Sequence, residues 1–164
     1  MSDADSQRRT YVESTVIMTT VRVIVPFVFT FGLYVMFHGA ESAGGGFQGG
    51  AIVASGILML AFAFGIEPTR EWLSDGFVRS IIAGGGGAFA LIGIGAVLSG
   101  GAFLDYAAYG IHHGVKYGIE LVELGIGAVV SGVIVALFLS LAAGFDASGF
   151  DDADAAEADG GERA

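Results

Sequence analysis

Four long apolar segments constrain the fold of this chain more than any other feature. They cover about residues 15–37, 49–66, 78–100 and 119–145. A helix of about 20 residues crosses the roughly 30 Å hydrocarbon core of a bilayer, and each segment is near that length. Lipid offers no partners to unpaired backbone groups, and four short strands cannot close a barrel. The sequence therefore predicts an all-α integral membrane protein with four transmembrane helices, which together form one domain over residues 15–145.

The composition supports this prediction. Of the 164 residues, 54% are hydrophobic and 15% are charged, against roughly 25% charged in ordinary soluble domains. A soluble fold of this length has too little interior to hide so much apolar surface. The chain has no cysteine, which excludes disulfides and thiolate metal sites. No sequence motif predicts a cofactor or a metal site. The polar start predicts an anchor that is retained rather than a cleaved signal peptide.

The two ends of the chain are polar. Residues 1–14 carry charges of both signs, and we expect them to form a cytoplasmic segment. Residues 146–164 hold seven acidic residues among alanine and glycine, a composition that predicts a disordered tail. Lys116 is the one lysine of the chain. Acid-rich and lysine-poor segments fit a salt-rich cytoplasm, so a halophilic source is one interpretation; a generic solubilising tail is the other.

Basic residues predict the orientation. With four spans, both termini and the second connection lie on one side, and Lys116 lies on the other. The positive-inside rule places the arginine-bearing side in the cytoplasm. The prediction is a multi-pass protein of the cell membrane with both termini inside and the glycine-rich first loop outside. The arginines that decide this are Arg8, Arg9, Arg70, Arg79 and Arg163.

The 28 glycines predict close helix packing. Small residues four apart form flat faces on which transmembrane helices meet. Because four spans offer limited internal contact, we expect these glycine-rich packing faces to bind further membrane subunits. The spaced pairs are Gly84 with Ala88, Ala96 with Gly100, and Ala128 with Gly132.

Arg22 lies inside the first apolar segment, where a charge is costly. Snorkelling to the interface and a structural salt bridge are equally good interpretations. Pro26, four residues on, removes the hydrogen bond to the Arg22 carbonyl and predicts a helix kink.

The start of the fourth span carries a second polar group. Lys116, Glu120 and Glu123 share one helix face, and His112 and His113 precede them. The simpler interpretation is an interfacial ion pair between Lys116 and Glu120. In the alternative, Glu123 lies one turn deeper and binds a proton or a cation that the histidines help to deliver.

The first loop, HGAESAGGGFQGG, covers residues 38–50. It is neither a dinucleotide-binding motif nor a P-loop. We expect a tight re-entrant or docking turn, in which His38 and Glu41 contact protons or cations, although His38 as an ordinary interfacial residue stays open. Gln48 is expected to cap a helix end or to bridge groups of the turn. The structural positions of this loop are Gly44, Gly45, Gly46, Phe47, Gly49 and Gly50.

The first span and this loop resemble the B subunit of the multisubunit Na+/H+ antiporters, the Mrp or Mnh family. The likeness rests on Arg22 and Pro26, on the FGLYVMFHG run and on GGGFQGG, and it covers about residues 15–65. This chain has Ala43 where the family usually has proline before the three glycines.

The resemblance implies a small membrane subunit of a cation/proton antiporter rather than an enzyme. Its partners would be the other subunits and lipid, with Na+ and H+ as transported ions and no nucleic acid. A structural subunit of a related hydrogenase or complex I-like assembly is the first alternative, and a stand-alone channel or transporter is the second. The candidates for the ion route or polar network are Arg22, His38, Glu41, Gln48, Glu120 and Glu123.

Overall fold

The computed structural model describes residues 14–41 and 43–145. The predicted acidic tail, and all but the last residue of the predicted N-terminal segment, lie outside this range. Within it the chain is helical, with no strand. The four longest helices are α1 (Thr15–Phe37), α2 (Gly46–Phe64), α4 (Asp75–Leu98) and α5 (Gly114–Phe145). All four are long and apolar enough to cross a membrane, which confirms the predicted all-α class.

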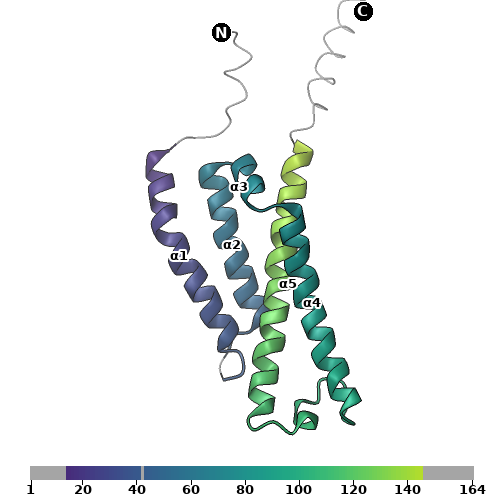
Figure 1. Cartoon of the computed structure of the whole chain (residues 1–164). Coiled ribbons are helices and arrows are strands. Elements are labelled where there is room, and N and C mark those ends of the chain that lie inside the picture. Colours follow the sequence, from purple (N-terminus) through teal and green to yellow (C-terminus); the bar gives the residue numbers. More distant parts are fainter. Residues whose placement is uncertain (1–13, 42, 146–164) are drawn as a thin grey trace, which may run out of the picture.

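The helices form a bundle around α5. Helix α2 packs against both α1 and α5, and α4 packs on α5, so that α1 and α4 lie on opposite sides of the bundle (Figure 1). Helix α1 starts, and α5 ends, at the end of the bundle that also holds the short helix α3 (Ile66–Trp72). We call this the α3 end. The turn between α1 and α2 and the 3-10 helix η2 (Tyr106–Tyr109) lie at the other end, which we call the η2 end.

Two apolar clusters hold the α3 half of the bundle together. The larger joins Ala54 of α2 to Leu73, to Val78 of α4, and to Val135 and Leu139 of α5. The smaller joins α1 to α2 through Val21, Val25 and Ala63. Elsewhere many large apolar side chains face outward: Phe27 is 71% exposed and Leu91 is 73% exposed. Such surfaces need lipid or other protein around them.

Glycine backbones meet at each of the three main helix contacts. A Cβ built on Gly49 of α2 would lie 2.6 Å from the Gly32 carbonyl oxygen of α1, and one on Gly50 would lie 2.7 Å from the Gly127 carbonyl oxygen of α5. Between α4 and α5, a Cβ on Gly85 would lie 2.5 Å from the Gly125 carbonyl oxygen. These distances are too short for any side chain, so glycine is what permits the helices to approach.

The small-residue pair Gly84 and Ala88, expected to bind a further membrane subunit, takes no part in the contact between α4 and α5. Both residues are exposed, and a Cβ on Gly84 would meet nothing within 4 Å. The neighbouring Gly85 faces α5 instead, because successive helix positions are rotated by about 100°. The surface of Gly84 and Ala88 is thus left open on the described chain.

The helix boundaries differ from the predicted ones at several places. Helix α2 begins at Gly46 and α5 at Gly114, so the last of the three consecutive glycines and Lys116 are helical. The second connection contains the unpredicted α3, whose first turn tolerates Pro68 because the amide it lacks would be unpaired there. Gly76 lies inside α4, which the Ser74 side chain caps by accepting from the Phe77 amide at 3.3 Å.

Candidate functional site at the η2 end

The polar residues expected from the sequence separate into two groups. Arg22 belongs to the half of α1 near the α3 end, where its guanidinium carbon lies 5.0 Å from the centre of the Phe64 ring. This is a cation–π contact between α1 and α2. The remaining candidates, from the turn, α2 and α5, gather at the η2 end: His38, Glu41, Gln48, Glu120 and Glu123.

Glu123 lies directly beneath the turn between α1 and α2. A Cβ built on Gly39 would overlap the Glu123 carboxylate, and one built on Gly45 would lie 3.1 Å from its Oε1. A Cβ on Gly46 would overlap the backbone carbonyl oxygen of the same glutamate. Gly39 and Gly45 thus cover the carboxylate without side chains, and Gly46 lies against the backbone of the same residue. We call Glu123 with Gly39, Gly45 and Gly46 the carboxylate site.

The carboxylate site contains an unsatisfied polar atom. Among the described residues, Oε2 of Glu123 is the buried side-chain oxygen without a hydrogen-bond partner. Buried acceptors are normally paired, so an exception calls for a reason, such as an ion, a proton or an ordered water. Helix α2 starts beside the carboxylate, with Gly45 as its N-cap and no side chain capping it. The positive end of the α2 dipole therefore faces this site.

Gly45 of the turn has a backbone conformation that glycine alone adopts readily. Its φ is 133°, a value that L side chains avoid. Gly44 and Gly46 do not have positive φ. Phe47 is 64% exposed. Gln48 is exposed in the first turn of α2.

Lys116 joins the turn to α5. Its Nζ donates to Oε1 of Glu41 and lies 4.0 Å from Oε1 of Glu120. The predicted pair with Glu120 therefore exists at the limit of ion-pair distance, and Glu41 is the closer partner. The hydrogen bond from Lys116, followed by the charge of Lys116, holds the pKa of Glu41 below its usual value.

Tyr106 packs on α5 from a segment that the sequence did not mark. Its ring occupies the space where a side chain at position 118 would stand, since a Cβ on Gly118 would overlap it. Burial, and then the negative charge of Glu123, raise the pKa of the Tyr106 hydroxyl above its usual value. A tyrosine in a loop carries no periodicity, so the sequence offered only the Gly-Tyr richness of this segment as a signal.

The three histidines make aromatic contacts of two kinds. The His38 ring stacks on Tyr34 of α1, with ring centroids 4.3 Å apart. His112 and His113 pack edge to face on each other in the connection before α5, and both are exposed. No group of three or more His, Cys, Asp or Glu side chains in the part of the chain that the structure describes could hold a metal ion.

Four apolar helices with a covered carboxylate at one end define a multi-pass helical membrane protein with a polar network. The chain belongs to the MnhB family: the family model described as "Domain related to MnhB subunit of Na+/H+ antiporter" matches residues 16–136. This membership confirms the resemblance seen in the sequence and the prediction of an antiporter subunit.

Two relatives show the extent of the likeness. The chain is 38% identical over 138 residues to the "Putative antiporter subunit mnhB2" of Staphylococcus haemolyticus (strain JCSC1435). It is 36% identical over 138 residues to the protein of the same name from Staphylococcus aureus (strain MRSA252). Each match covers 80% of this chain and 97% of the relative.

Proposed function

We propose that this chain works as a membrane subunit of a multisubunit Na+/H+ antiporter and that its carboxylate site lies on the route of the exchanged ions. Family membership supports the first part. One observation carries the second: the buried Oε2 of Glu123 has no partner among the described residues. Ionisable groups inside membrane spans are costly, and they are retained where protons or ions pass.

The carboxylate site is suited to transient binding. The glycine cover keeps side chains away from the carboxylate, so a small cation or a proton reaches it without displacing a side chain of the turn. Glu41 of the turn and Glu120 of α5 both pair with Lys116. We infer that the ion pair fixes the turn, while Glu123 stays free to exchange its ligand.

The bundle favours a subunit over a free-standing channel. Its outward apolar surfaces and the open face of Gly84 and Ala88 leave ample area for other membrane subunits. The MnhB match favours an antiporter over a hydrogenase-type assembly. We infer the predicted orientation, with the α3 end in the cytoplasm, from Arg70 and Arg79 at that end and Lys116 at the other.

Substitution of the carboxylate tests the ion-route proposal. Glu123→Gln keeps the shape of the side chain and removes its charge. We expect the complex to assemble, and Na+-dependent proton movement in everted membrane vesicles to fall to a small fraction of the parent value. Glu123→Asp should retain part of it. Glu67→Gln, an exposed carboxylate of α3, is the matched control.

Assembly is measured separately by purifying the complex in mild detergent and identifying its members. Iron–sulfur or nickel proteins in place of antiporter subunits would contradict the antiporter assignment. Full exchange by an assembled Glu123→Gln complex would instead remove Glu123 from the ion route and leave the subunit assignment standing.

A further inference from the structure

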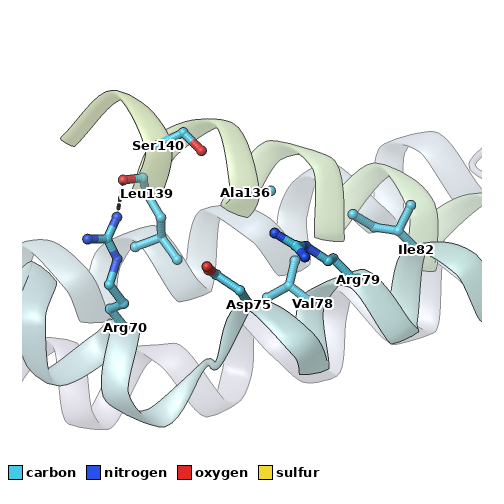
Figure 2. A pocket seen from close by; sticks show the side chains of 8 residues that line it. All are labelled: Arg70, Asp75, Val78, Arg79, Ile82, Ala136, Leu139 and Ser140. Carbon is cyan, nitrogen blue, oxygen red and sulfur yellow. Dashed lines mark hydrogen bonds between the residues drawn. The ribbon is translucent and has the colours of Figure 1, made fainter. Parts of the chain in front are cut away.

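A second polar site lies at the α3 end, far along α5 from the carboxylate site. It is a cavity of about 270 Å³ between the start of α4 and the last turns of α5 (Figure 2). Neither the ion pair of Lys116 nor the glycine turn contributes to it. Its lining residues are Arg70, Asp75, Val78, Arg79, Ile82, Ala136, Leu139 and Ser140.

The mouth of this cavity is basic. Arg70 is held in place because its Nη2 donates to the Leu139 carbonyl oxygen at 2.7 Å. The Arg79 guanidinium and the Asp75 carboxylate both point from α4 toward α5 (Figure 2). No salt bridge within 4 Å joins either arginine to an acidic group among the described residues. Two guanidinium groups against one carboxylate leave the cavity with a net positive charge.

The wall of the cavity is apolar and runs deeper into the bundle. Val78 and Ile82 follow Asp75 along α4 by about one and two turns, and Ala136 stands one turn before Ser140 on α5. Asp75 is the first residue of a membrane-spanning helix. The charged mouth therefore lies where headgroups are found, and the apolar wall lies where acyl chains begin.

We propose that this cavity binds the headgroup phosphate of an anionic phospholipid, with one acyl chain along Val78, Ile82 and Ala136. Basic pockets between membrane helices recognise such headgroups. Arginine suits a phosphate because its planar guanidinium donates two parallel hydrogen bonds. Asp75 opposes the anion and limits the affinity. The apolar wall distinguishes a lipid from free phosphate, which would gain nothing from Ile82 or Ala136.

Binding of a labelled lipid to the purified complex tests this proposal. Fluorescent phosphatidylglycerol is added to the complex in a mild, uncharged detergent, and its anisotropy is followed. Phosphatidylcholine with the same chains and label is the zwitterionic comparison. We expect phosphatidylglycerol to bind at least about fivefold more tightly, the contribution of about one basic residue at a membrane surface.

Two variants with opposite expected effects on the lipid affinity test whether the lipid binds in this cavity. Arg79→Gln should weaken phosphatidylglycerol binding about fivefold, and Asp75→Asn should strengthen it. Arg79 is exposed, so its replacement spares the fold, which unchanged co-purification of the other subunits verifies. Arg22→Gln, which removes an arginine outside the cavity, and Glu71→Gln, which removes an exposed carboxylate of α3, are the matched controls and should bind like the parent.

Four results would overturn the proposal. Arg79→Gln could bind phosphatidylglycerol as the parent does, or the parent could fail to distinguish the two lipids. Inorganic phosphate at millimolar concentration could displace the lipid fully, which would identify a free-anion site. Binding could also occur only after removal of residues 146–164, which would make the acidic tail the occupant.

Discussion

Lys116 forms its close ion pair with Glu41, 75 positions away in the chain, while Glu120 on its own helix lies 4.0 Å away. The pair joins the turn between α1 and α2 to the first turns of α5. Because the glycines of this turn cover Glu123, the position of the turn and the exposure of the carboxylate are linked. The surface ion pair is therefore of interest for the geometry that it maintains more than for its contribution to stability.

The Glu41–Lys116 pair should make the turn sensitive to acid. Lys116 lowers the pKa of Glu41 in the folded protein. The pair is therefore fully formed above the ordinary glutamate pKa of about 4.3, and it is lost as the pH falls through the lowered pKa of the folded state. A spin label on Ala43→Cys, in a chain with no other cysteine, should become more mobile over that interval. Lys116→Gln should give the mobile spectrum at every pH, and Glu120→Gln should change little. A label whose mobility does not depend on pH in the parent would show that the pair does not hold the turn.

Gly39 and Glu123 should be energetically coupled. A Cβ at position 39 would overlap the carboxylate, so Gly39→Ala must move the turn or the glutamate, at the cost of about 1–3 kcal/mol that overpacking usually brings. In the background of Glu123→Ala the same substitution loses its three nearest neighbours, which are all atoms of the Glu123 carboxylate. Thermal unfolding of the four variants should give a coupling of about 0.5–3 kcal/mol. Additive effects would mean that Gly39 does not contact Glu123.

The sequence predicts the spans of this protein well because length and hydropathy alone decide them. Contacts between spans depend on rotation about each helix axis, which hydropathy does not report, and so the contact of Gly85 with α5 was not predicted. The same limit applies to Lys116. Spacing along one helix predicted Glu120 as the partner of Lys116, whereas Glu41 becomes a partner of Lys116 only when the turn folds over α5. Tyr106 was missed because a loop residue has no pattern that could reveal its neighbours.

Gly65 should tolerate alanine poorly. It joins α2 to α3 with φ 101° and ψ 153°, a region that is open almost only to glycine. Gly65→Ala should lower the stability of the subunit by about 1–3 kcal/mol through backbone strain. Gly76→Ala is the matched control: Gly76 is helical, and a Cβ there meets nothing within 4 Å. The melting temperature of the purified complex compares the two, and equal values would contradict the strained junction.

Adjacent glycines of α4 should respond in opposite ways to alanine. Gly85→Ala places a methyl group 2.5 Å from the Gly125 carbonyl oxygen, so we expect α4 and α5 to separate and the isolated subunit to lose about 1–3 kcal/mol. Gly84→Ala meets nothing within 4 Å and should leave the isolated subunit unchanged or up to about 1 kcal/mol more stable, since alanine favours the helix.

In the assembled complex, the alanine variant of Gly84 also tests whether another subunit packs on this face. If another membrane subunit packs closely on the face of Gly84 and Ala88, then Gly84→Ala will reduce co-purification of that subunit while the isolated chain keeps its stability. Ala88→Leu, on the same face one turn later, should reduce it further because a larger side chain keeps two backbones apart. Melting curves of the isolated subunit and quantitative recovery of its partners separate the two effects. Complete recovery with both variants would mean that this face meets lipid rather than protein.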